Sequence, residues 1–190
     1  MKSPPRFMVR DAQPADRPQL VAFVAALQNL ERTLHAGRAE GRRIAAAHLV
    51  HLEQAARERR GRVLVAARGE ERLGFLVGWV EEEARGSHHV RPPERRYGVV
   101  TDLYVEPGAR ARGIAVALLE EAARHFAALG MTRLRVRTLA ANQAALRFYR
   151  ALGYAPYELT LERELPHAKP RRATRTRARR GPRARGRGSQ

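Results

Sequence analysis

One short run of residues carries groups that bind phosphate, and it lies between a predicted strand and a predicted helix. Residues 110–116 read Arg-Ala-Arg-Gly-Ile-Ala-Val. A helix that begins here leaves backbone N–H groups without intrahelical partners, and its dipole adds partial positive charge. Gly113 and Ala115 put little side chain in front of that backbone, and Arg110 and Arg112 can add charge-assisted hydrogen bonds. The run therefore predicts an anion site; the alternative is an ordinary strand–turn–helix with surface arginines.

Two familiar nucleotide-binding motifs do not fit this loop. There is no Gly-Lys-Ser/Thr at the start of the helix, as a P-loop requires, and no Gly-x-Gly-x-x-Gly, as a dinucleotide site requires. A second motif lies downstream, where residues 142–154 read Asn-Gln-Ala-Ala-Leu-Arg-Phe-Tyr-Arg-Ala-Leu-Gly-Tyr.

Together, the two motifs make the chain resemble the GCN5-related N-acetyltransferase (GNAT) superfamily over roughly residues 6–164. The superfamily's phosphate loop has the form Arg/Gln-x-x-Gly-x-Gly/Ala, which Arg110, Gly113 and Ala115 match in register. Its later Asn…Phe-Tyr…Leu-Gly-Tyr/Phe pattern is matched by Asn142, Phe148, Tyr149, Leu152, Gly153 and Tyr154.

The resemblance implies a fold, a reaction and a donor site. The fold is an α/β architecture whose mixed, mostly antiparallel central sheet is flanked by helices. The reaction moves an acetyl group from acetyl-CoA to a primary amine of a small molecule, protein or peptide, by direct attack in a ternary complex. The residues that it assigns to acetyl-CoA are Leu103, Tyr104, Val105, Arg110, Ala111, Arg112, Gly113, Ile114, Ala115, Val116 and Asn142.

Tyr149 stands where the superfamily places its general acid. A phenol with a pKa of about 10 is well matched to protonating a departing thiolate; the alternative is a packed aromatic ring with a satisfied hydroxyl. The general base is open. Members that resemble the polyamine acetyltransferases carry Glu-Asp where this chain has Thr101-Asp102, so Asp102, Glu81, Glu83 or a water chain could serve.

The elements that position these residues follow from hydrophobic periodicity. Strands are predicted at 7–10, 63–68, 73–83, 99–105 and 133–138, with one or two more within 154–165. Helices are predicted at 14–34, 43–60, 112–129 and 142–152. The connection between the first two helices is where the superfamily covers its acceptor, so Glu31, His35 and Glu40 are candidate substrate contacts, or else ordinary solvated charges.

Charge separates the chain into two predicted regions. The net charge is +18, and residues 167–190 hold ten of the 37 Lys and Arg but none of the 19 acids, which leaves +8 for the remainder. We predict a GNAT domain at 1–166 and a disordered Arg-rich tail at 167–190. The tail could contact RNA, DNA or the ribosome, or could be a passive solubilising extension.

Composition bounds the remaining possibilities. The absence of cysteine excludes disulfides, thiolate metal sites and a cysteine nucleophile, and it is compatible with a cytoplasmic protein. No apolar run approaches membrane-spanning length, and a homodimer is left open. A basic nucleic-acid- or ribosome-associated module, in which the acyl-CoA fold is mainly a scaffold, is the alternative to the enzyme.

Overall fold

The structure, a computed structural model, describes residues 7–84 and 86–165. The described residues fall into two units, one of residues 7–84 and 86–155 and one of residues 156–165. All helices and strands of the described residues belong to the first unit, so the two predicted motifs and the elements that carry them share one body. The predicted Arg-rich tail at 167–190 lies outside the described residues.

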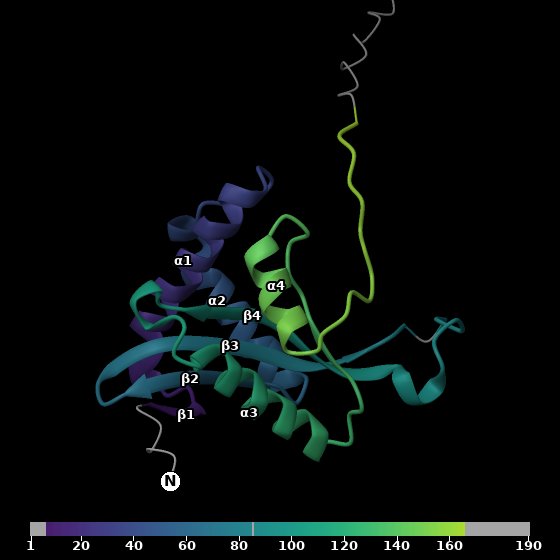
Figure 1. The fold of residues 1–190 in the computed structure, drawn as a ribbon, viewed down its shortest axis with the longest axis horizontal. Helices are drawn as coiled ribbons and strands as arrows, with labels where there is room; N and C mark the ends of the chain where they lie inside the picture. Colours follow the sequence, from purple (N-terminus) through teal and green to yellow (C-terminus); the bar gives the residue numbers. More distant parts are fainter. Residues whose placement is uncertain (1–6, 85, 166–190) are drawn as a thin grey trace, which may run out of the picture. The chain divides into compact units, whose positions relative to one another are not determined.

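The first unit is built on a five-stranded sheet in the order β1-β2-β3-β4-β5 (Figure 1). The first four strands pair antiparallel, and β5 runs parallel to β4. The predicted mixed, mostly antiparallel sheet is thereby confirmed. The strands are β1 (Met8–Asp11), β2 (Arg62–Arg68), β3 (Glu71–Glu82), β4 (Arg96–Val105) and β5 (Leu134–Val136).

Helices cover both faces of the sheet, because alternate strand residues are apolar on each side. One buried cluster joins α1 (Arg17–Leu34) and α2 (Gly41–Glu58) to the sheet. A second cluster joins the sheet to α3 (Ile114–Ala128), and Phe148 and Tyr149 of α4 (Gln143–Ala151) pack against it. We call these two sides of the sheet the α1–α2 face and the α3–α4 face.

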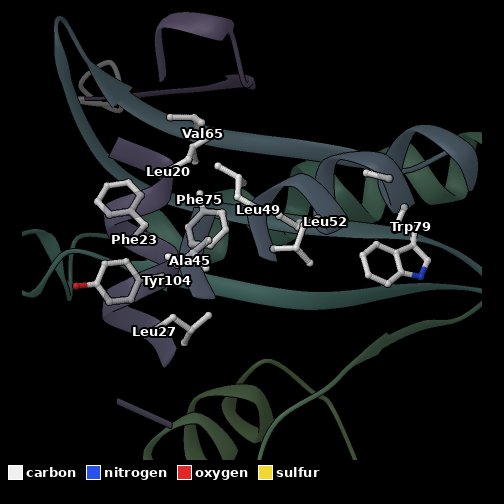
Figure 2. Packing of buried hydrophobic residues seen from close by; sticks show 14 of the residues in the cluster. Leu20, Phe23, Leu27, Ala45, Leu49, Leu52, Val65, Phe75, Trp79 and Tyr104 are labelled. Atoms are coloured by element: carbon white, nitrogen blue, oxygen red, sulfur yellow. The ribbon is translucent and has the colours of Figure 1, made fainter. Parts of the chain in front are cut away.

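Aromatic packing anchors α1 on its face. Figure 2 shows the rings of Phe23, Phe75 and Tyr104 grouped together, and the Phe23 ring centroid lies 5.4 Å from that of Tyr104 and 6.0 Å from that of Phe75. The backbones of α1 and α2 also approach closely, since a Cβ on Gly41 would lie 2.1 Å from the Ala25 carbonyl oxygen. These contacts set the position of α2 relative to β4.

A β-bulge in β4 reverses which side chains face α1 and α2. Val77 pairs with Asp102 and Gly78 pairs with Val100, so Thr101 is the extra residue. Before the bulge Val99 faces α1 and α2, and after it Tyr104 does, which places Asp102 on that same face. Gly78 permits this register, because a Cβ there would lie 2.6 Å from the Val99 carbonyl oxygen.

The prediction of one or two final strands within residues 154–165 is wrong. Residues 156–165 have no helix or strand, and the large apolar side chains at Tyr157, Leu159 and Leu161 are exposed. Their alternation satisfies the strand pattern, yet a strand exists only when another strand accepts its backbone hydrogen bonds, and the described sheet ends at β5.

Candidate active site

The loop before α3 presents unsatisfied backbone amides, as the sequence predicts for an anion site. After a 3₁₀ turn at Pro107–Ala109, Ala111 and Gly113 adopt positive φ values of 59° and 80°. Gly113 is the N-cap of α3, and no side chain caps this end of the helix. Nothing lies within 4 Å of where a Cβ of Gly113 would be, so the space beside the first residue of this helix start is open. The first-turn N–H groups have no intrahelical partner.

Arg110 ties this loop to the end of β4. Its Nε donates to the Val105 carbonyl oxygen at 3.1 Å, and its guanidinium lies 5.9 Å from the centroid of the Tyr104 ring. The predicted phosphate-loop arginine is therefore held between the loop and the strand. Arg112 is exposed beside it, so positive charge surrounds the free amides.

One edge of β4 is open beyond Val100. Strand β5 pairs only with Gly98, Val99 and Val100, and the N–H of Arg137 makes the last bond, to the Val100 carbonyl at 3.0 Å. Residues 103–105 pair with β3 on their other side and have no strand partner on the β5 side among the described residues. This edge fits an extended ligand with amide groups, such as the pantetheine arm of acetyl-CoA, which would add as a further strand.

Asn142 and Tyr149 both lie on the α4 segment. The Asn142 Oδ1 accepts a hydrogen bond from the Ala145 N–H at 3.1 Å, which makes Asn142 the N-cap of α4 and leaves its amide N–H₂ as the donor for a ligand. Tyr149 packs against Phe148 and Tyr154, with centroids 5.3 and 5.7 Å away. Burial raises the pKa of the Tyr149 phenol, with a smaller contribution from Tyr154, so its proton is retained at neutral pH.

The acidic run 81–83 pairs with the basic face of β5 and the residues that flank it. The Glu81 carboxylate accepts a hydrogen bond from Arg137, and Arg135 Nη1 lies 2.9 Å from Glu83 Oε1. Arg135 also lies over the Tyr97 ring, 3.6 Å from its centroid. Guanidinium pairing occupies the lone pairs that a base would need, so Glu81 and Glu83 are poor candidates for that role. Of the three carboxylates considered as the general base, Asp102 remains.

The structure places Asp102 beside a histidine that the sequence analysis did not select. The Nε2 of His48, on α2, lies 3.7 Å from the Oδ1 of Asp102. Glu31, a predicted substrate contact, belongs to the same cluster, because its charge and that of Asp102 both act on His48. A sequence signal did exist: His48 lies three residues after Ala45 and four before Leu52, within the buried stripe of its helix.

The other two predicted substrate contacts have local partners instead. The Nδ1 of His35 accepts the N–H of Gly37 at 3.1 Å. Glu40 lies 3.0 Å from Arg43 Nε, an ion pair within the first turn of α2. Glu31, by contrast, is close enough to Asp102 for that carboxylate to raise its pKa.

A family model described as "Acetyltransferase (GNAT) family" matches residues 24–154. The chain belongs to the GNAT family. Members of this family take their acetyl group from acetyl-CoA, and one similar solved structure, an aminoglycoside N-acetyltransferase, is a complex with CoA. That structure is 14% identical, with a TM-score of 0.62 over 87% of this chain and 98% of its own.

Two further relatives agree with this assignment. A mycothiol acetyltransferase of Streptomyces scabiei is 34% identical over 89 residues, which is 46% of this chain but only 29% of that protein. An aminoglycoside 6'-N-acetyltransferase of Acinetobacter haemolyticus is 18% identical, with a TM-score of 0.59 over 85% of this chain and 99% of its own. At such identities the solved structures establish the shared fold.

Two features are absent from the part of the chain that the structure describes. None of the helices in residues 7–84 and 86–165 combines the length and the apolar character needed to cross a membrane. Across those same ranges, no three His, Cys, Asp or Glu side chains gather as a metal site would require.

Proposed function

We propose that this protein is an acetyl-CoA-dependent N-acetyltransferase that acetylates a primary amine. The observation that carries the proposal is the uncapped start of α3, next to a β4 edge with no strand partner in residues 7–84 and 86–165. A protonated Tyr149 packs on the face of the sheet that α3 covers. The three together supply amides for a pyrophosphate, a backbone edge for pantetheine and an acid for the leaving sulfur.

Each of these groups has its own role in binding acetyl-CoA or in the acetyl transfer. The backbone of 103–105 and the N–H₂ of Asn142 bind the pantetheine arm, and the amides of 111–116 with Arg110 and Arg112 bind the phosphates. Tyr149 donates its proton to the departing sulfur. The chain contains no cysteine, which fits direct attack by the amine without a thiol acyl carrier on the protein.

The proposed acceptor is a primary amine. The similar proteins are a mycothiol acetyltransferase and aminoglycoside acetyltransferases, so amino sugars enter a test panel alongside polyamines and peptides with free N-termini or lysines. Calorimetry would measure acetyl-CoA binding, and a thiol reagent would detect the CoA released with each acceptor. Failure of acetyl-CoA to bind, or binding without acceptor-dependent CoA release from a broad panel, would overturn the proposal.

A second proposal concerns the Arg-rich residues 167–190, whose ten cations and absence of acids favour contact with RNA or DNA. It is compatible with the first, since such contact would deliver the enzyme to an acceptor on a ribonucleoprotein. The cytoplasmic location, the homodimer and the boundary at residue 166 stay predictions of the sequence.

A further inference from the structure

Three ionisable side chains from three elements converge on the α1–α2 face of the sheet. They are Glu31 of α1, His48 of α2 and Asp102 of β4. The Asp102 side chain is 6% exposed and that of His48 is 32% exposed, with 3.7 Å between Asp102 Oδ1 and His48 Nε2. A buried carboxylate requires a partner, and His48 is the one side chain at ion-pair distance from Asp102 among the described residues.

The charges around His48 favour its protonated form. The Asp102 carboxylate is the main cause that raises the pKa of His48, and Glu31 adds to it, while partial burial and the Arg38 guanidinium act in the opposite direction. Glu31 is itself held near Arg38, whose Nε is 3.5 Å from Glu31 Oε2. Burial raises the pKa of Glu31, with Asp102 adding to the effect. The exposed ring of His51 stacks on His48 from the next turn of α2, 6.2 Å between centroids.

We propose that His48, oriented by Asp102, is the base that removes the proton from the acceptor ammonium. The inference rests on the proposed acetyl transfer and supplies the group that the sequence leaves open at Thr101-Asp102. Because Nε2 is the ring nitrogen nearest Asp102, Nε2 carries the proton and Nδ1 the free lone pair. The carboxylate orients the ring, as in other His–carboxylate pairs.

The position of the pair relative to Tyr149 suits the reaction. Asp102 directly precedes residues 103–105, the proposed pantetheine edge, so the base lies next to the reacting end of the donor arm. Tyr149 packs on the α3–α4 face, whereas Asp102 points to the α1–α2 face. The amine can thus approach from one side of the sheet while the sulfur leaves toward the other.

The proton balance closes without any further reactant. Nδ1 of His48 takes one proton from the ammonium, and the neutral nitrogen then forms its bond to the acetyl carbon as the carbon–sulfur bond breaks. Tyr149 protonates the sulfur, and the second proton lost from nitrogen returns to the Tyr149 oxygen through solvent. His48 releases its proton to bulk water, so the net products are the amide, CoA and one proton.

This role sets the direction of the pH dependence. Only neutral His48 can accept a proton, so kcat/KM should rise with pH through the pKa of His48, which lies above its usual value of about 6.5. Asp102→Asn removes the main cause of that elevation and should move this rise in kcat/KM, the acidic limb of the pH profile, to lower pH. His48→Gln should abolish the limb and lower kcat by about 10²–10⁴-fold.

The experiment uses full-length protein, acetyl-CoA and the panel amine that gives the fastest CoA release. His48→Gln, Asp102→Asn and the control His88→Gln, which makes the same substitution at an exposed histidine of the loop before β4, are compared by kcat/KM from pH 5 to 10. Calorimetric affinity for acetyl-CoA should be unchanged in all three, and His88→Gln should keep the wild-type profile. Circular dichroism verifies folding.

Several results would overturn the inference. Wild-type kcat and an unchanged acidic limb in His48→Gln would show that His48 takes no proton. If Asp102→Asn does not fold, NMR titration of the His48 ring protons in the wild-type protein replaces it, and a pKa at or below the usual value would refute the pairing. An inactive wild-type protein would instead refute the proposed function, which separates the two failures.

Discussion

Replacing Gly113 by Asp places a negative charge at the uncapped start of α3, where the phosphates of acetyl-CoA are proposed to bind. Gly113 has a φ of 80°, with open space around the position of a Cβ, so no side chain there would clash. The backbone cost of a non-glycine residue at this φ is about 1 kcal/mol. Gly113→Asn carries the same cost at the same size without charge, and it is the matched control.

The difference between the two variants isolates the electrostatic contribution. Two like unit charges at about 5 Å repel by about 1–3 kcal/mol when the effective dielectric lies between that of a protein surface and that of water. Acetyl-CoA should therefore bind Gly113→Asp roughly 5- to 150-fold more weakly than Gly113→Asn. Because the site is exposed, the gap should shrink as NaCl is raised from low salt to about 0.5 M.

Isothermal titration calorimetry with acetyl-CoA measures both affinities, and thermal unfolding confirms that the two variants are equally folded. Equal affinity of Gly113→Asp and Gly113→Asn at low salt would refute the assignment of the phosphates to this loop. A gap that does not respond to salt would show that the loss comes from distortion of the loop instead of charge.

Three other perturbations test separate parts of the molecule. Tyr149→Phe keeps the ring and should lower kcat by about 10²–10⁴-fold with little change in acetyl-CoA affinity; wild-type turnover would make Tyr149 a structural residue. Asp16 is fully buried, and its carboxylate lies 2.6 Å from Arg10 and 2.7 Å from Arg72. Asp16→Asn should lower the free energy of unfolding by about 3–5 kcal/mol. A loss below about 1 kcal/mol in urea titration would contradict this. Arg10 is the main cause that lowers the pKa of Asp16. The stabilisation by the Asp16 carboxylate should therefore be complete above the usual Asp pKa of about 3.9 and should decline as pH falls below that value. Acid unfolding curves of the wild-type protein and Asp16→Asn would show this difference. Deleting residues 167–190 should leave acetyl-CoA affinity intact and flatten the salt dependence of RNA binding; equal slopes with and without the tail would place the charge contacts on the rest of the chain.

Some backbone features of the proposed donor site depend only on local residue choices. The positive φ of Gly113 and the cap made by Asn142 depend on residues within one turn of the chain, so their sequence signals are direct. Gly153 likewise has the positive φ of 86° expected after a helix end. The four helices and the strands through β5 follow hydrophobic periodicity, and their observed ends lie within a few residues of the predicted ones.

Other features depend on contacts between distant segments, which periodicity does not encode. Glu81 and Arg137 each look like surface charge until the parallel pairing of β5 with β4 brings them together across 56 residues. The alternating residues of 156–165 indicate a strand, but no local pattern supplies the partner whose hydrogen bonds a strand needs.

His48 and Asp102 show the same division most clearly. The sequence determines that Asp102 follows a buried strand segment and that His48 lies on the inner stripe of a helix. Only the tertiary structure decides that they meet, because the bulge at Thr101 turns Asp102 toward the face of the sheet on which α2 packs. A one-residue shift of register would turn the Asp102 carboxylate to the opposite face, where α3 and α4 pack.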